Sequence, residues 1–223
     1  EGKCHTHEEL MAAVGETQKD KHGKVILPYT PHVEGQHSYV KEATDRGYKV
    51  LVMDGPLAAH VVGKLEQTHS DVQFKRVDAD IADKLIEKDE ELTSALDDAQ
   101  QDTLKPILEG AFPGEGYKVQ FAPMSPNAAP LVITQSEFMR RMKEQQAVGG
   151  GGFQMFGDMP DSYEVTVNAN HPLATSLLNE TDDAKRNALA KQAANLARLS
   201  QGLLEGEELT AFIQDGFAQL HQA

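Results

Sequence analysis

Cys4, His5 and His7 are the first residues of the chain whose side chains are able to carry chemistry. Thiolate and imidazole groups are the usual protein ligands of zinc. Structural zinc sites take their ligands as spaced pairs, whereas these three residues fall within one short run and no second pair follows. The other histidines are scattered along the chain. The sequence therefore predicts no metal site and no bound cofactor in this chain.

Asp54 is the second candidate, because it directly follows the predicted strand 48–53. Enzymes with parallel sheets often place catalytic or ligand-binding groups at the carboxyl ends of strands. A small-molecule-binding or enzyme domain with its site near Asp54 is therefore an alternative function. However, no phosphate-binding loop, nucleophile elbow or Walker lysine accompanies this residue, and the glycine run 149–152 follows no strand. We predict that Asp54 caps the next helix and that the chain has no catalytic residues.

The composition is that of an acidic, globular protein. The 223 residues include 21 basic and 35 acidic side chains, giving a net charge of −14. This charge argues against a nucleic-acid partner, because phosphate backbones are bound by Lys and Arg. No apolar run reaches the length of a membrane span. A single cysteine, Cys4, rules out an internal disulfide bond and suits a reducing compartment, so we predict a cytoplasmic protein. The chain begins with Glu1 rather than Met, so we expect it to be a segment of a longer protein.

Residues 1–87 are predicted to form an α/β sub-domain, a small parallel sheet with helices. Strands are expected over residues 24–29, 48–53 and 72–77, with amphipathic helices between them. The first two strands contain unbroken apolar runs, which are typical of strands covered on both faces. Strands that alternate with helices indicate parallel pairing.

Residues 88–223 are predicted to form an α+β domain. Its three-stranded sheet is expected over residues 117–122, 131–134 and 163–168, and the tail that follows the third strand is expected to be helical. Helical spacing of apolar residues predicts a helix through residues 79–110. The boundary between the two domains is placed in the acidic part of this helix.

Residues 136–160 are the main candidate for a binding function. Ser136 is a natural N-cap, and a short apolar stripe follows it on an otherwise polar helix. The glycine run 149–152 then leads into a second short segment rich in Met and Phe. Methionine forms adaptable contact surfaces, and exposed apolar patches usually mark binding sites. The alternative is a buried core helix followed by a loop. The predicted contact residues are Phe138, Met139, Met142, Phe153, Met155 and Phe156.

The C-terminal helices are predicted to form a dimer interface. Apolar residues recur at helical spacing on two consecutive helices at the chain end, and nothing in the sequence that follows could cover them. Helix hairpins with one uncovered face commonly close by pairing with a second copy, which gives a four-helix bundle. The alternative is that the last helix folds back on the chain's own sheet. The predicted interface residues are Leu196, Leu199, Leu203, Leu209, Phe212, Ile213, Phe217 and Leu220.

Several stretches resemble, in order, segments of one chaperone family. They are residues 24–29 with Gln36-His37-Ser38-Tyr39, Val50-Leu51-Val52-Met53-Asp54-Gly55-Pro56-Leu57, Ser125-Pro126 with Pro130-Leu131-Val132, Phe138-Met139-Arg140-Arg141-Met142-Lys143, Val165-Thr166-Val167-Asn168 with Asn170-His171-Pro172-Leu173, and Leu196-Ala197-Arg198-Leu199 with Leu203-Leu204-Glu205-Gly206. With these motifs the chain resembles the C-terminal half of the 90-kDa heat-shock chaperones, in the bacterial form known as high-temperature protein G. The matching part comprises the end of the middle domain and the C-terminal dimerisation domain.

This resemblance implies part of a homodimeric, ATP-driven folding clamp that acts in the stress response. The family's ATP-binding domain lies upstream, so ATP and Mg would be cofactors of the parent ATPase, and this chain itself would neither bind nor hydrolyse ATP. The implied partners are a second copy of the chain and non-native client proteins, with no nucleic acid and no membrane. Eukaryotic cytosolic members end in Met-Glu-Glu-Val-Asp, whereas this chain ends in His221-Gln222-Ala223, which favours the bacterial form.

Overall fold

The structure is a computed structural model that describes residues 5–88, 92–114, 116–136, 140 and 162–220. The chain divides into two compact units, which are described separately. Unit 1 contains the described residues of Glu1–Glu90 and Gln135–Gly157, and unit 2 those of Glu91–Thr134 and Asp158–Ala223. Among the helices described, none combines the length and apolar character that crossing a membrane requires.

Unit 1 alternates helices and strands. Its elements are α1 (His7–Val14), the 3-10 helix η1 (Gly15–Gln18), β1 (Val25–Thr30), α2 (His37–Asp45), β2 (Leu51–Val52), α3 (Ala58–Thr68), β3 (Val72–Arg76) and α4 (Ala82–Leu85). The strands form a parallel sheet in the order β2-β1-β3. This confirms the predicted small parallel sheet with helices.

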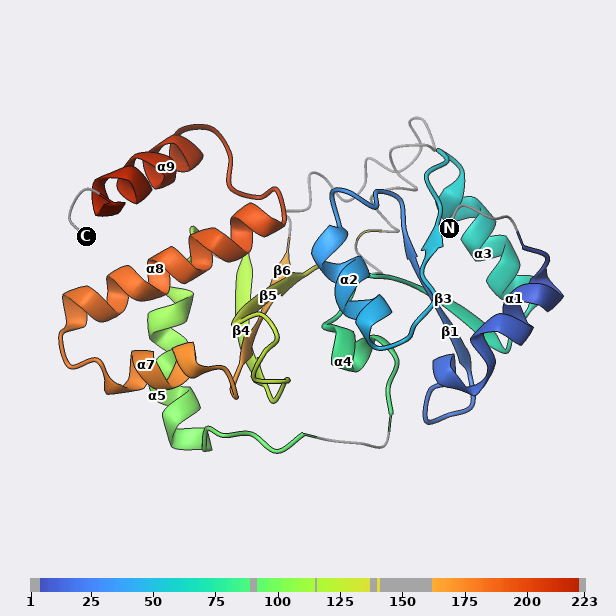
Figure 1. Ribbon diagram of the computed structural model, residues 1–223, viewed down its shortest axis with the longest axis horizontal. Coiled ribbons are helices and arrows are strands. Elements are labelled where there is room, and N and C mark those ends of the chain that lie inside the picture. Colours follow the sequence, from blue (N-terminus) through green and yellow to red (C-terminus); the bar gives the residue numbers. More distant parts are fainter. Residues whose placement is uncertain (1–4, 89–91, 115, 137–139, 141–161, 221–223) are drawn as a thin grey trace, which may run out of the picture. The chain divides into compact units, whose positions relative to one another are not determined.

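Helices cover both faces of this sheet. In Figure 1, α2 and α4 lie on one side of β1 and β3, and α1 and α3 lie on the other. Successive side chains of β1 point to opposite faces of the sheet, and each face has its own core. Val25, Leu27 and Tyr29 belong to the core on the side of α1 and α3, whereas Ile26 belongs to the core on the side of α2 and α4. The unbroken apolar run of β1 is therefore buried along its whole length, as predicted.

The predicted second strand is much shorter than residues 48–53. Only Leu51 and Val52 pair with β1, and Val52 is exposed. Pro28 offers a reason. Successive backbone amides of a strand point to opposite neighbouring strands. The amide of Val25 points toward β3, where it donates to the carbonyl of Asp71, so the backbone nitrogen of residue 28 faces β2. Pro28 has no N–H to donate to β2.

The buried side chain of Gln18 replaces the missing strand pairing. Its Nε2 donates to the carbonyl of Ile26 at 2.9 Å and lies 3.4 Å from the carbonyl of Lys49. Its Oε1 accepts from the amide of Lys49 at 2.6 Å. A side-chain amide therefore joins β1 to the segment before β2, where the backbones do not pair.

Replacing Gln18 with Leu should lower the stability of unit 1 by about 2 kcal/mol, because the backbone groups of Ile26 and Lys49 lose their hydrogen-bond partners. Urea unfolding of the variant measures the change. Gln120→Leu serves as the control, because Gln120 is exposed and its loss leaves no buried backbone group without a partner. Equal unfolding midpoints for Gln18→Leu and wild type would contradict this role.

The helix predicted over residues 79–110 is two helices. α4 ends at Leu85. The next helix is α5 (Asp98–Glu109), whose N-cap Asp97 forms a capping box with Gln100. The apolar residues before the break belong to the core of unit 1, and Leu96 and those after it belong to unit 2. Their helical spacing was misleading, because it combined residues of two separate cores.

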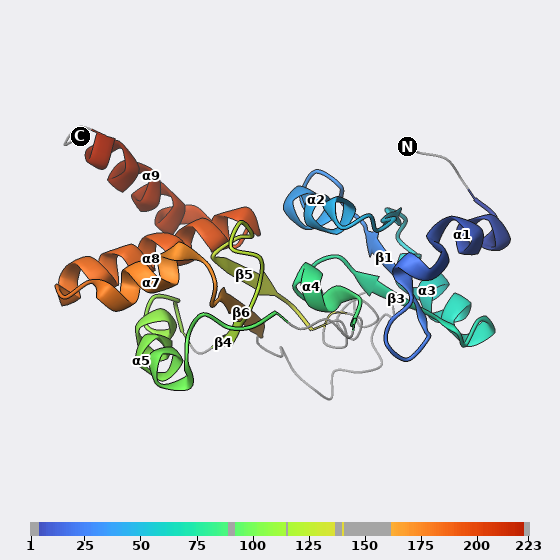
Figure 2. The same ribbon diagram turned by 60° about the horizontal axis from the view of Figure 1, so that its bottom comes forward.

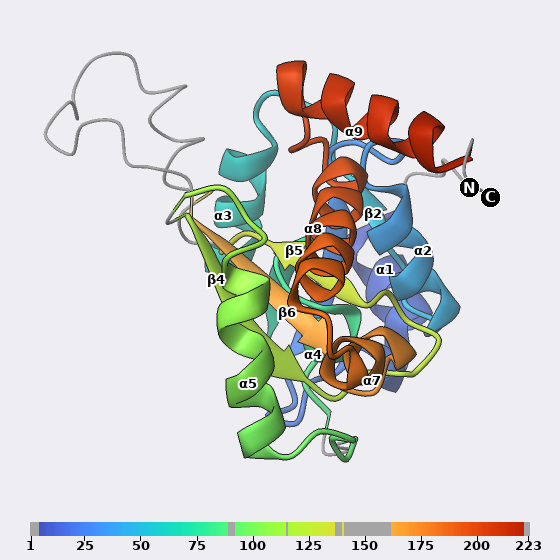
Figure 3. The same cartoon turned by 90° about the vertical axis from the view of Figure 1, so that its left-hand side faces the viewer.

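Unit 2 contains the three predicted strands and the C-terminal helices. After α5 come β4 (Tyr117–Ala122), β5 (Leu131–Thr134), β6 (Tyr163–Asn168), α7 (Pro172–Asn179), α8 (Asp183–Ser200) and α9 (Gly206–Leu220). The sheet order is β4-β6-β5, with β4 parallel and β5 antiparallel to β6. Figures 1 and 3 show α5, α7 and α8 gathered on one side of this sheet. This three-stranded sheet confirms the predicted strands, whereas the domain boundary at residue 87 stays a prediction.

Candidate interaction surface

The predicted recognition residues of segment 136–160 lie outside the described residues. Phe138, Met139, Met142, Phe153, Met155 and Phe156 are the six concerned. Within that segment Ser136 and Arg140 are described, and the amide of Arg140 donates to the carbonyl of Ser136 at 3.1 Å. The prediction for the six residues therefore stays a prediction.

Helix α8 places small residues against the sheet and large apolar residues toward solvent. Ala190, Ala194 and Ala197 are buried in the core of unit 2. Leu196 and Leu199 are 52% and 42% exposed. A soluble helix normally has the reverse arrangement, with its large apolar residues inside. The exposed leucines therefore mark a surface that unit 2 itself does not cover.

The end of α8 fixes the direction of the chain that leads to α9. The amides of Gly202 and Leu203 donate to the carbonyls of Leu199 and Arg198, which is a Schellman motif. Gly202 has a φ of +66°, a conformation that glycine adopts without strain. Leu204 is then buried and anchors the connection. In Figure 1 the chain turns here and α9 runs back in the opposite direction to α8.

Helix α9 leaves most of its apolar side chains uncovered. Ile213, Phe217 and Leu220 are 48%, 67% and 75% exposed, while Leu209 and Phe212 are half-buried. No described side chain of α9 is buried. Figures 2 and 3 show α9 departing from the layer formed by α5, α7 and α8. The alternative that α9 folds back on the chain's own sheet is therefore wrong for this structure.

A buried arginine joins α8 to the first turn of α9. Arg198 Nη2 donates to Glu208 Oε2 at 2.6 Å and to the carbonyl of Leu203 at 3.1 Å. Burial opposes the charge of Arg198, but the hydrogen bond and the charge of Glu208 outweigh it, so the pKa of Arg198 lies above its usual value. The same hydrogen bond lowers the pKa of Glu208. The role of Arg198 in joining α8 to α9 was not predicted. Arg198 follows Ala194 by four residues, so both residues lie on the same buried face of the helix.

Asp54 was the candidate residue for a small-molecule site. Asp54 is exposed, and α3 begins after Leu57 without a side-chain cap, so the predicted capping by Asp54 is wrong. His7 stacks on His69 with ring centroids 3.8 Å apart, and Cys4 lies outside the described residues. In the part of the chain that the structure describes, no group of three or more His, Cys, Asp and Glu side chains is arranged to hold a metal ion.

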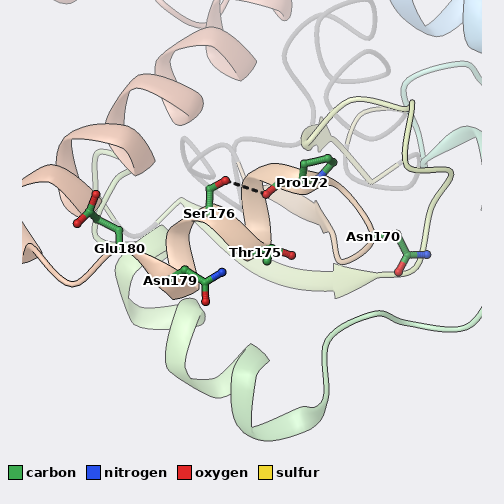
Figure 4. A pocket seen from close by; sticks show the side chains of 6 residues that line it. All are labelled: Asn170, Pro172, Thr175, Ser176, Asn179 and Glu180. Carbon is green, nitrogen blue, oxygen red and sulfur yellow. Dashed lines mark hydrogen bonds between the residues drawn. The ribbon is translucent and has the colours of Figure 1, made fainter.

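A shallow depression in unit 2 is lined by polar side chains. It has a volume of about 690 Å³, and Figure 4 shows the side chains of Asn170 and of α7 around it. Asn170 has a structural task there, because its amide donates to the carbonyls of Thr93 and Met124 and accepts from the amide of Ala95. The N-cap of α7 is His171, whose Nδ1 accepts from the amide of Leu173.

Comparison with known proteins places the chain beside bacterial chaperones. It is 35% identical over 202 residues to the chaperone protein HtpG of Porphyromonas gingivalis, which covers 89% of this chain and 29% of the relative. The HtpG of Bacteroides thetaiotaomicron is 36% identical over 188 residues, or 82% of this chain and 27% of the relative. The HtpG of Bacteroides fragilis is 34% identical over 194 residues, or 85% and 28%. No family model matches the chain. The chain therefore spans less than a third of the length of these curated relatives.

Proposed function

The chain is homologous to a segment of the HtpG chaperones, and from this premise we propose that it is the part of a folding clamp that forms the dimer and presents apolar surface to non-native proteins. The homology supports a chaperone function. The observation that carries the finer proposal is the uncovered apolar surface of α8 and α9.

The assignment of domains follows the same premise. Residues 1–87 would be the end of the middle domain, and residues 88–223 the C-terminal dimerisation domain. ATP and Mg would act in another part of the parent protein, which would be the ATPase, while this segment supplies no catalytic residue and binds no cofactor. The protein would work in the cytoplasm, with a second copy of the chain and non-native clients as its partners.

The dimer is proposed to pair the uncovered helix faces of two copies. Five of the eight predicted interface residues are exposed and three are half-buried, and they lie on α8, α9 and the connection between these two helices. In a two-fold dimer each patch meets the same patch of its partner, so each side chain is buried twice per dimer. The resulting four-helix arrangement would remove from water an apolar surface that is unusual for a monomer.

The client-binding step is proposed to depend on this dimer. Two copies of the recognition segment, held at a fixed separation, raise the effective concentration of the second contact once the first has formed. An extended client that reaches both copies would bind more tightly to the dimer than to either copy alone. Clients with exposed apolar stretches fit this mode, since Met and Phe contacts adapt to varied sequences.

Sedimentation equilibrium over a range of protein concentrations tests the proposal. We expect a dimer at low micromolar concentration. A chain that remains monomeric at about 50 micromolar, a concentration at which a weak homodimer should be populated, would argue against dimerisation through this segment alone. Client binding is measured on the same samples by fluorescence anisotropy. The client is fluorescently labelled α-lactalbumin, which stays unfolded because it has been reduced and carboxymethylated.

Replacing Met139 and Met142 together with Ser should weaken binding of this client about tenfold, because part of the apolar contact is lost. Fluorescence anisotropy measures the affinity, and sedimentation should show an unchanged dimer. The matched control is Leu57→Ser with Val61→Ser, which removes exposed apolar surface on and beside α3. Unchanged affinity in the Met139/Met142 variant would exclude these residues from client binding.

A further inference from the structure

The chain contains two steps at which glycine directly follows aspartate. They are Asp54-Gly55 and Asp215-Gly216, and the sequence has no Asn-Gly step. The side-chain carboxyl group of such an aspartate is open to attack by the next backbone amide, because glycine has no side chain to obstruct the approach and leaves the backbone free to turn. Whether either step reacts depends on the local structure that holds it.

The step at Asp54 lies in the connection between β2 and α3, outside both elements. Residues 54–57 are all exposed. Among the described residues, none accepts a hydrogen bond from the amide of Gly55 and none donates one to the carboxylate of Asp54. The amide and the carboxyl group that it would attack are therefore adjacent, open to water and held by no other group of the described chain.

The surroundings of Gly55 also leave room for the backbone to turn. A Cβ atom at this position would meet no heavy atom within 4 Å. Before the step, the amide of Met53 donates to the carbonyl of Thr30 at 2.9 Å. After it, the amide of Ala58 donates to the carbonyl of Gly55 at 3.0 Å. The peptide group between Asp54 and Gly55 takes part in neither contact.

The step at Asp215 is held differently, although its two residues are of the same types. It lies inside α9, which is helical throughout Gly206–Leu220. An interior helix amide donates to the carbonyl four residues before it, and a five-membered ring through these atoms requires a backbone conformation outside the helical range. A Cβ atom at Gly216 would also meet no heavy atom within 4 Å, so space does not distinguish the two steps. Hydrogen bonding and backbone conformation do.

We propose that Asp54 is a site of spontaneous isoaspartate formation, and that α9 protects Asp215 from the same reaction. This modification is independent of the proposed chaperone function. It gives the connection between β2 and α3 a reactivity that needs no catalytic partner for Asp54, only its exposure and the glycine that follows it.

The reaction begins when the backbone nitrogen of Gly55 attacks Cγ of Asp54. A C–N bond forms, the amide proton and the carboxyl hydroxyl leave as water, and a cyclic succinimide results. Water then adds to one of the two ring carbonyls. Addition at Cγ breaks the new bond and restores aspartate, whereas addition at the backbone carbonyl carbon breaks the original peptide bond and leaves the chain running through the side chain. One water leaves and one enters, so no other reactant is needed.

Isoaspartate at position 54 would act first on the edge of the sheet. The product adds an extra carbon atom to the backbone between β2 and α3 and places the former backbone carboxyl group on a side branch. Within the sheet β2 pairs only through Leu51 and Val52, and the bond from Met53 to Thr30 is the last one before the modified residue. The modification therefore falls beside the strand with the fewest backbone contacts to hold it.

Incubation of the full 223-residue chain in water enriched in heavy oxygen tests the inference, because each passage through the succinimide places one heavy oxygen in the aspartate. The tryptic peptides 50–64 and 199–223 report the two steps separately, since each contains a single aspartate. In the folded chain we expect labelling at Asp54 to be at least about tenfold faster than at Asp215, because an interior helix turn opens rarely. In concentrated guanidinium chloride the two rates should agree within about threefold, since the fold no longer separates them. Equal rates in the folded chain would overturn the inference.

Two glycine substitutions give matched controls. Neither glycine has a positive φ, so alanine fits at both positions. Gly55→Ala places a methyl group beside the attacking nitrogen and should slow labelling at Asp54 about tenfold or more. Gly216→Ala adds the same group to α9 and should leave the rate at Asp54 unchanged. An unchanged rate at Asp54 in Gly55→Ala would show that the label enters by another route and would overturn the inference.

A methyltransferase specific for isoaspartate distinguishes the two products of ring opening. Such an enzyme transfers a methyl group from S-adenosylmethionine to the carboxyl group of isoaspartate and leaves ordinary aspartate unmodified. After incubation we expect peptide 50–64 to accept methyl groups and peptide 199–223 to accept at least about tenfold fewer. Labelled peptide 50–64 that accepts none would show that the ring reopens only to aspartate, and Asp54 would not be a site of isoaspartate formation.

Discussion

Phe217→Glu should convert the proposed dimer into a monomer. Phe217 is among the most exposed apolar side chains of α9, so the variant should fold normally and lose only the contact with a second copy. Burying one phenylalanine contributes about 1.5–3 kcal/mol, and a two-fold dimer loses this contribution twice. The introduced carboxylates add the cost of burying charge. The dissociation constant should therefore rise at least about 100-fold.

The matched control for this variant is Ala218→Glu. It introduces the same charge one residue further along α9, and the helical rotation per residue directs position 218 away from the stripe of Ile213, Phe217 and Leu220. We expect its dissociation constant to stay within about threefold of wild type, because surface charges away from an interface have small effects. Sedimentation equilibrium measures both variants, and comparable dimer populations in the two would contradict the proposed interface.

Arg198→Ala should lower the stability of unit 2 by about 2–3 kcal/mol. The substitution removes a buried side chain of α8, and it leaves the carbonyl of Leu203 without the hydrogen bond that Arg198 donates. It also releases Glu208 and so loosens the first turn of α9. Urea unfolding followed by circular dichroism measures the loss. Lys185→Ala removes an exposed ion pair with Asp182 and should change stability by less than about 0.5 kcal/mol.

The pH dependence of this contact has a defined sign. The pKa of Glu208 is lowered in the folded chain by its hydrogen bond to Arg198, so the contribution of the pair is complete above the ordinary carboxyl pKa of 4.5. It is lost as the pH falls through the lowered, folded value. Wild type should therefore lose stability relative to Arg198→Ala as the pH drops below 4.5. A constant difference between the two across that range would show that Glu208 adds nothing to the docking of α9.

Local patterns in the sequence were sufficient to predict most strands. The strands 117–122, 131–134 and 163–168 match β4, β5 and β6, because alternating side chains reflect a property of the strand itself. The start of α1 also depends on local residues alone, because Thr6 and Glu9 form a capping box whose two hydrogen bonds span three positions.

Features that depend on distant partners could not be predicted in this way. The shortness of β2 follows from Pro28 and from Gln18, and Gln18 contacts Lys49 across 31 positions of sequence. The break between α4 and α5 was hidden because Leu85 and Leu96 keep a helical spacing while packing into different cores. Arg140 is buried beside Asp78, 62 positions away, and nothing in the local pattern distinguishes Arg140 from Arg141.

The candidate surface was predicted in part. The apolar stripe of α9 follows from helical spacing, and the structure leaves Ile213, Phe217 and Leu220 of this stripe exposed. On α8 the predicted interface residues Leu196 and Leu199 lie outside, whereas the neighbouring apolar residue Ala193 lies inside. Which of two apolar groups faces the core depends on how closely a helix approaches its sheet, and that distance is not encoded in periodicity.

The use of Gln18 in place of strand pairing makes the two edges of the first sheet unequal in local stability. β1 and β3 share a continuous register from Val25 with Val72 to Tyr29 with Arg76, so these two strands can pair through backbone contacts alone. The segment before β2 is joined to β1 by the side chain of Gln18 instead, through its contacts with Ile26 and Lys49. We therefore expect hydrogen exchange to show the β2 edge opening at a lower free energy than the β1–β3 pair.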